Sequence, residues 1–258
     1  VTRHPLERDE DIYDLKWPGP ESGFNPMMRR FGEIARRERL DNEPFNAFIG
    51  AGMAYNLACQ IVGLERFLKW LVKKPGLAHD LIDRVSDWSL ASLPAQKEAL
   101  GIDGVLGGGG SAMASNQLIS ARVFVEYALP DIKKGQAMLR ELGYKTTYAH
   151  ICGEQNDNLP YWADVDFGDP GIIGIGPEIS LERAAELFPD DIILGNLDPA
   201  IVQTAGPQEV YEAVRKTVEV GKKIKGGYIF SPGCDLPPRA PVENVRMMTQ
   251  AINDFGWY

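Results

Sequence analysis

The chain of 258 residues carries 27 basic and 36 acidic side chains, so its formal net charge is −9, and hydrophobic residues make up 44%. This length and balance are typical of a globular protein with one well-buried core, and the acidic charge argues against nucleic acid as a partner. No apolar run reaches the ~18 residues of a membrane-spanning helix. No signal peptide opens the chain, and three cysteines make no disulfide framework. We therefore expect a cytoplasmic protein with no membrane partner.

Residues 1–43 are polar and interrupted by prolines, with one amphipathic helix predicted over 26–40. We expect this segment to be peripheral and mostly helical. After it, short apolar runs alternate with longer segments of helical period, which is typical of βα units around a parallel sheet. Strands are predicted at 45–49, 104–106, 146–151, 171–175, 191–194 and 228–230. Helices are predicted at 64–71, 78–93, 123–142, 181–187, 208–220 and 242–255.

The alternation predicts a single α/β domain over residues 1–258, built as a TIM-type (β/α)8 barrel. Only six strands are predicted, whereas a closed barrel of this type has eight. We therefore expect the chain to lack the N-terminal one or two strands of the barrel. Because open edges leave backbone N–H and C=O groups unpaired, residues should precede Val1 in the natural protein, or a neighbouring subunit should cover the gap. The second alternative is a homo-oligomer.

Three metal-ligand residue types fall at the predicted carboxyl ends of strands. His150 and Cys152 are two positions apart, so in a strand their side chains lie on the same face. Cys234 follows the strand predicted at 228–230 in a Ser-Pro-Gly-Cys turn. Because the carboxyl ends of parallel strands meet at one edge, these side chains should converge, and one imidazole with two thiols is a ligand set typical of catalytic zinc. By contrast, Cys59 lies on a predicted helix face and is expected in the core.

Two acidic residues compete for the fourth ligand position. Glu178 follows the strand predicted at 171–175, whereas Glu154 is close to Cys152 in the sequence. The spacing of the residues leaves both alternatives open.

Three motifs resemble a known family. They are His-Ile-Cys-Gly (150–153), Gly-Asn-Leu-Asp-Pro (195–199) and Ser-Pro-Gly-Cys-Asp-Leu-Pro-Pro with Ala-Pro-Val-Glu-Asn (231–244). They resemble the uroporphyrinogen decarboxylase superfamily, and within it the corrinoid-dependent methyltransferases typified by methylcobalamin:coenzyme M methyltransferase. The likeness runs from about residue 40 onward. The His-x-Cys…Cys signature is its specific part, because Gly-Asn-x-Asp-Pro is shared across the superfamily.

The resemblance implies a zinc-dependent methyltransferase. It would move a methyl group between a corrinoid (cobalamin) carried by a partner protein and a thiol or methylated small molecule, and the direction of transfer stays open. The order His-x-Cys…Glu…Cys is similar to that of cobalamin-independent methionine synthase, which favours Glu178 as the fourth ligand. Asn196 and Asp198 could then contact substrate or orient a ligand. The alternative for Asp198 is that it caps a helix.

The glycine run 107–110 also follows a predicted strand. Gly107 and Gly108 could let the flat corrin ring approach. No Gly-Lys-Ser/Thr follows, which argues against a nucleotide phosphate loop.

Two other functions stay open. The first is tetrapyrrole decarboxylation, which in this superfamily needs no metal. The arginine-rich motif and catalytic aspartate of those enzymes have no visible counterpart here, although family members run longer than this chain. The second is an accessory protein that binds a corrinoid or a metal without catalysis.

Overall fold

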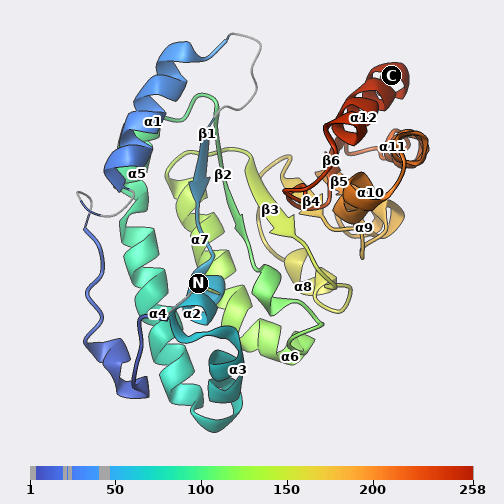
Figure 1. Ribbon diagram of the computed structural model, residues 1–258. Coiled ribbons are helices and arrows are strands. Elements are labelled where there is room, and N and C mark those ends of the chain that lie inside the picture. The colour runs from blue at the N-terminus through green and yellow to red at the C-terminus, as the bar shows by residue number, and fades with distance from the viewer. Residues whose placement is uncertain (1–3, 20–21, 23–24, 41–46, 258) are drawn as a thin grey trace. The chain divides into compact units, whose positions relative to one another are not determined.

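The computed structural model describes residues 4–19, 22, 25–40 and 47–257. By their contacts they form two compact units. Unit 1 comprises residues 1–114 and 122–147, and unit 2 comprises residues 115–121 and 148–258. Each unit is α/β, with parallel strands and helices that alternate along the chain (Figure 1).

Unit 1 is mostly helical and contains two parallel strands, β1 (Ala47–Gly50) and β2 (Val105–Gly110), paired in register from Ala47 opposite Val105. Its helical segments are η1 (Asp9–Tyr13), α1 (Asn25–Glu38), α2 (Ala54–Val62), α3 (Leu64–Lys73), α4 (Pro75–Ala91), α5 (Leu93–Leu100), η2 (Ala112–Ala114), α6 (Ala121–Val123), η3 (Phe124–Ala128) and α7 (Leu129–Glu141). The strands pack against helices through a buried apolar cluster that includes Ile49, Leu93, Val105 and Leu139.

Unit 2 contains four parallel strands that pair in sequence order, β3 (Thr147–Ile151), β4 (Ile172–Ile175), β5 (Ile192–Leu197) and β6 (Tyr228–Pro232). Its helices are α8 (Leu159–Trp162), α9 (Leu181–Leu187), α10 (Pro199–Thr204), α11 (Pro207–Gly221) and α12 (Val242–Phe255). Every residue of β4 is buried, which is the apolar pattern of a parallel strand covered on both faces.

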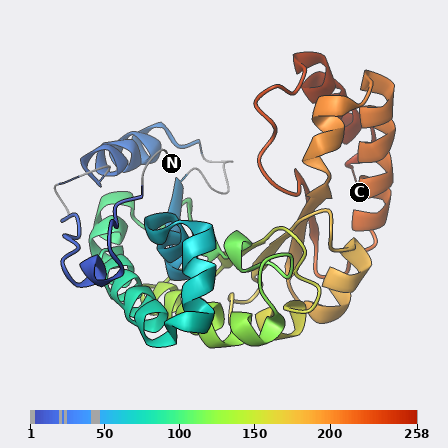
Figure 2. The ribbon, with the colours of Figure 1, turned by 60° about the horizontal axis from the view of Figure 1, so that its bottom comes forward.

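The helices of unit 2 begin and end where local chemistry requires it. The Ser180 hydroxyl accepts a hydrogen bond from the backbone N–H of Arg183 at the start of α9. Pro207 is the first residue of α11, where a missing N–H costs nothing. Helices α11 and α12 lie side by side (Figures 1 and 2) and share a core that includes Val210, Val214 and Met248.

All six predicted strands are present, with differences at their ends. The start of the first prediction, residues 45 and 46, lies outside the described residues. β2 continues through the glycine run, and β5 continues to Leu197, so Gly195 and Asn196 lie in the strand and not in a turn after it. The described part of residues 1–43 contains η1 and α1 and no strand.

The segment predicted as one helix over 123–142 is helical through Glu141, but it is not one regular α-helix. The structure has α6, the π-helix η3 and then α7, with Pro130 in the first turn of α7. A proline lacks the N–H that bonds to the fourth preceding carbonyl, and its ring crowds that carbonyl, so the regular ladder cannot continue through it. The helix predicted at 78–93 ends where α5 begins, so α5 was not predicted.

Candidate metal centre

The first two donor side chains lie at the end of β3. His150 lies in the strand and Cys152 directly after it, and both are on the same face as Tyr148. His150 is half-buried and stands opposite Gly174 of β4 in the parallel register. The backbone carbonyl of Ile151 accepts a hydrogen bond from the N–H of Gly176, at 3.0 Å, which ties the end of β3 to the loop after β4.

Cys234 reaches the same place from the loop after β6. The N–H of Gly233 donates to the carbonyl of Leu197 at 2.8 Å. A Cβ atom at Gly233 would lie 2.8 Å from Cδ of Pro177 and 3.0 Å from Cα of Gly176. Only glycine therefore lets the loops after β4 and β6 approach this closely. That approach places the exposed Cys234 thiol beside the end of β3.

The three donor atoms meet. The ligand atoms of His150, Cys152 and Cys234 all lie within 4.8 Å of one another, and Nε2 of His150 is 3.8 Å from Sγ of Cys234. In a tetrahedral site with Zn–S and Zn–N bonds of about 2.3 and 2.0 Å, donor atoms are about 3.5–3.8 Å apart. The separation of the imidazole nitrogen from the thiol therefore fits a zinc ion with little movement.

The protonation states of the two partly enclosed donors differ. Burial lowers the pKa of His150, so its imidazole is neutral at pH 7 and offers a lone pair. Burial, with the neighbouring Cys234 and Glu178, raises the pKa of the Cys152 thiol to about 12. Cys152 therefore keeps its proton at neutral pH unless a cation takes the proton's place.

The two candidate fourth ligands have different surroundings. One carboxylate oxygen of Glu154 accepts hydrogen bonds from both the backbone N–H and the side-chain amide of Asn156, each at 2.8 Å. The carboxylate of Glu178 instead bends back over Gly176, where Oε2 lies 2.6 Å from the position that a Cβ would take. That position is itself 3.3 Å from Cα of Cys152. Glu178 is outside the three-donor group but beside it.

Two asparagines hold the backbone that carries Glu178. The side-chain amide of Asn156 donates to the carbonyl of Glu178 at 3.0 Å, and that of Asn196 donates to the carbonyl of Ile179 at 2.7 Å. Asp198 caps α10, because its carboxylate accepts from the N–H of Ala200 at 2.8 Å. The structure thus gives Asn196 a backbone partner next to Glu178, and it bears out the helix-cap interpretation of Asp198.

The glycine run lies in unit 1, within β2. A Cβ at Gly107 would lie 3.0 Å from a methyl group of Leu139, and one at Gly109 would lie 1.9 Å from the carbonyl oxygen of Ala51. Close packing against α7 and the chain after β1 therefore accounts for these two glycines. The role of Gly107 and Gly108 in corrin binding stays a prediction.

A buried network of amide side chains, which was not predicted from the sequence, is hydrogen-bonded to the backbone of Cys152. The side chain of Gln155 donates to the carbonyl of Cys152 at 3.1 Å and accepts from the indole N–H of Trp162 at 2.9 Å. Asn158 donates to Gln155 and accepts from Asn116. Gln155 and Asn158 are fully buried, so the network fixes the loop after β3. The sequence did contain a signal for this network, because three amide residues, Gln155, Asn156 and Asn158, closely follow Cys152.

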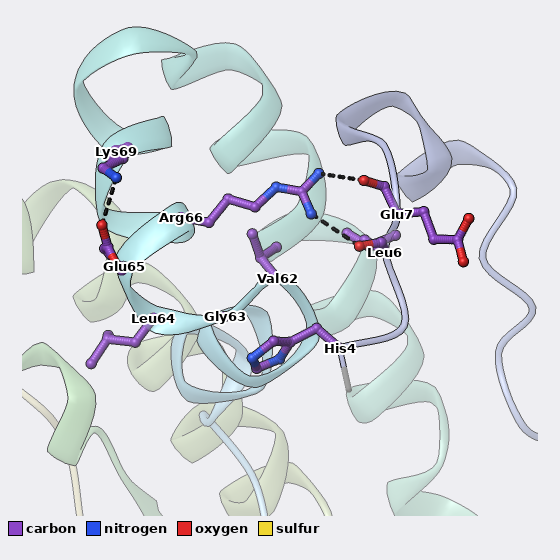
Figure 3. Close-up of a pocket in the computed structure, with 9 residues that line it drawn as sticks. All are labelled: His4, Leu6, Glu7, Val62, Gly63, Leu64, Glu65, Arg66 and Lys69. Carbon is purple, nitrogen blue, oxygen red and sulfur yellow. Dashed lines mark hydrogen bonds and ion pairs between the residues drawn. The ribbon is translucent and has the colours of Figure 1, made fainter. Parts of the chain in front are cut away.

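A cavity of about 610 Å³ is lined by residues of unit 1 only. Figure 3 shows these residues. The two longest cationic side chains of the cavity, Arg66 and Lys69, are paired with acceptors of unit 1. Arg66 donates to the backbone carbonyls of Leu6 and Glu7 and is paired with Asp9, and Lys69 is 2.6 Å from Glu65. The cavity holds none of the three metal-ligand candidates.

The family profile described as "Uroporphyrinogen decarboxylase (URO-D)" matches residues 1–255. The chain belongs to the uroporphyrinogen decarboxylase family. The resemblance read from the motifs is therefore confirmed.

Three relatives illustrate the breadth of this family. The methylcobamide:CoM methyltransferase MtbA of Methanosarcina acetivorans is 27% identical over 262 aligned positions, which cover 100% of this chain and 72% of that protein. The methylcobamide:CoM methyltransferase MtaA of Methanosarcina barkeri is 27% identical over 204 positions, covering 77% and 55%. A uroporphyrinogen decarboxylase of Xanthomonas euvesicatoria is 26% identical over 270 positions, covering 98% and 72%.

A solved methyltransferase from Methanosarcina mazei has the same fold. It superposes with a TM-score of 0.77 at 22% sequence identity and covers 98% of this chain and 71% of that structure. The parallel α/β fold class of the sequence analysis is therefore confirmed. Within the described residues, no helix is long and apolar enough to cross a membrane.

Proposed function

We propose that this chain is a methyltransferase that moves a methyl group between a corrinoid and the sulfur or methylated group of a small molecule. Relatives that match across the whole chain or most of it are named methylcobamide:CoM methyltransferases, and the expectation of an enzyme of this class agrees with those names. The observation that carries the proposal is the convergence of one imidazole and two thiols at the carboxyl ends of β3 and β6. The corrinoid would reach the site on a partner protein.

His150, Cys152 and Cys234 would hold a Zn²⁺ ion, and Glu178 would complete the set. The ion supplies a Lewis acid, which lowers the pKa of a bound thiol or draws electrons from a methylated atom. The protein contributes a neutral imidazole, two thiols that give up their protons on binding, and a backbone that Asn156, Asn196 and Gln155 hold in place. Of the two acidic candidates, Glu178 is favoured because one carboxylate oxygen of Glu154 already accepts two hydrogen bonds from Asn156.

The transfer itself breaks one bond and forms another. In the direction towards a thiol, the sulfur forms a bond to the methyl carbon as the cobalt–carbon bond breaks, and the electron pair of that bond stays on the corrinoid. The thiol proton leaves to solvent. Positioning both reactants in line is the contribution expected of the protein.

Tetrapyrrole decarboxylation is the second candidate, because a relative of that name matches at nearly the same identity. A direct comparison separates the two. The purified protein, loaded with zinc, is incubated with methylcobalamin and a panel of small thiols, and separately with uroporphyrinogen. We expect loss of the methylcobalamin spectrum with a thiol, no release of CO2 from the tetrapyrrole, and loss of the transfer in Cys234→Ser. Decarboxylation that survives complete removal of metal would replace the proposal with its alternative.

A further inference from the structure

Tyr148 lies on the same face of β3 as His150, two residues earlier. Its hydroxyl is 2.8 Å from Nδ1 of His150, and the two rings are 6.1 Å apart between centroids. The remaining ring nitrogen of His150, Nε2, is the atom directed at Cys234. The hydrogen bond therefore engages the nitrogen that a metal ion would not use.

The neighbouring strand makes room for the phenol. In the parallel register Tyr148 stands opposite Ile172 and His150 opposite Gly174. A Cβ at Gly174 would lie 2.6 Å from the hydroxyl oxygen of Tyr148 and 2.7 Å from Cε2 of its ring. Any other residue at position 174 would displace the phenol, so Gly174 secures its contact with the imidazole.

We propose that Tyr148 is a positioning residue that fixes the ring orientation and the tautomer of His150, so that Nε2 is presented to the metal. This inference rests on the proposed metal site. When a metal occupies Nε2, Nδ1 carries the proton and donates it to the hydroxyl oxygen of Tyr148. Histidine ligands in proteins usually donate this proton to a carboxylate, a backbone carbonyl or water, and such partners are worth about 10–100-fold in metal affinity. Here a phenol takes that place.

The test removes the hydroxyl and keeps the ring. Tyr148→Phe is compared with the unaltered chain for Zn²⁺ affinity, measured by competition with a chromophoric chelator, and for the visible spectrum of the Co²⁺-loaded protein. We expect affinity about 10–100-fold weaker and altered cobalt ligand-field bands. Tyr144→Phe is the matched control, since Tyr144 is a buried tyrosine of unit 1 whose hydroxyl donates to the carbonyl of Gly101 at 3.0 Å. It should leave both readouts unchanged.

Nitrogen-15 spectra of the histidine side chains provide a second readout on the unaltered protein. The chain has three histidines, so the ring signals of His150 are assigned against His4 and His79. With Zn²⁺ bound, Nδ1 of His150 should carry a proton and Nε2 should be shifted by the metal. Zn²⁺ affinity within about twofold of the unaltered chain in Tyr148→Phe, or metal bound at Nδ1, overturns the inference but not the metal site. An unaltered chain that binds no stoichiometric Zn²⁺ overturns both.

Discussion

The three cysteines of this chain have different environments, and serine at Cys234 and at Cys59 should separate metal binding from stability. Cys234 is exposed, so Cys234→Ser should change the free energy of unfolding of the metal-free protein by no more than about 0.5 kcal/mol. It should nevertheless abolish zinc binding and methyl transfer, because a hydroxyl does not ionise as a thiol does. Chemical denaturation and a zinc titration measure the two effects.

Cys59 provides the control for this experiment. It is buried in α2 and is not a member of the three-donor group. A hydroxyl there would lose its contact with water, so Cys59→Ser should lower the free energy of unfolding by about 1–3 kcal/mol and leave zinc binding unchanged. The opposite pattern, with metal lost in Cys59→Ser and kept in Cys234→Ser, would contradict the assignment of the ligands.

A buried carboxylate should make stability depend on pH. Asp131 is 5% exposed and accepts a hydrogen bond from the N–H of Ala54, the first residue of α2. Burial raises the pKa of Asp131 above its ordinary value of about 4, so the folded state binds this proton more tightly than the unfolded state does. The stabilising effect of the protonated form is complete below pH ~4 and is lost as the pH rises through the raised pKa.

Asp131→Asn isolates this effect, because an amide oxygen still accepts from Ala54 but does not ionise. We expect the free energy of unfolding of the variant, relative to the unaltered protein, to rise between pH ~4 and neutrality. Urea denaturation of both proteins across that range measures it. A difference between the two proteins that is the same at every pH would show that burial does not perturb Asp131.

At the same scale, strand alternation and strand ends were sufficient to predict that His150, Cys152 and Cys234 converge. The same patterns were insufficient to predict which other side chains contact these three donors. The contact of Tyr148 with His150 depends on the space that Gly174 leaves on another strand, and the choice between Glu154 and Glu178 depends on Asn156. The space beside Tyr148 follows from the register of β3 against β4, which no local pattern encodes. The Asn156–Glu154 contact is local, and it depends on the conformation of the loop after β3.

Among the elements, β2 contains a glycine, Gly109, at a position where the neighbouring chain leaves no room for a side chain. A Cβ at Gly109 would lie 1.9 Å from the carbonyl oxygen of Ala51, and a backbone atom cannot rotate away. Gly109→Ala should therefore destabilise the protein by about 3 kcal/mol or more, the upper part of the range for overpacking. Gly76→Ala in α4 is the control, because nothing lies within 4 Å of its Cβ position and alanine favours a helix. Equal free energies of unfolding for the two variants would contradict this packing.

Element prediction succeeded where local chemistry sets the boundary and failed where it does not. Ser180 and Pro207 correctly indicate the starts of α9 and α11. The extension of β2 and β5 arises from pairing with neighbouring strands, which continues through glycines of weak strand propensity. The interruption of the helix before Pro130 could have been predicted from the sequence, because a proline inside a helical pattern disturbs the regular hydrogen bonding.

For the whole molecule, zinc should act as a stabilising ligand. Free Zn²⁺ at about 100 times its Kd adds about 2.7 kcal/mol to the free energy of unfolding, provided that the unfolded chain does not bind it. All three donors belong to unit 2, so hydrogen exchange should slow there on zinc addition. The Cys234→Ser protein should show no such change, and equal slowing in that variant would indicate a different site.

The X-ray absorption spectrum of the purified, zinc-loaded protein at the zinc edge tests the central claim most directly, because it reports the atoms bound to the metal. We expect one zinc per chain with two sulfur neighbours at about 2.3 Å and nitrogen or oxygen neighbours at about 2.0 Å. Cys234→Ser should bind no stoichiometric zinc, and any zinc that it retains should have at most one sulfur neighbour, from Cys152. A zinc shell without sulfur, or a shell that is the same in both proteins, would contradict the account.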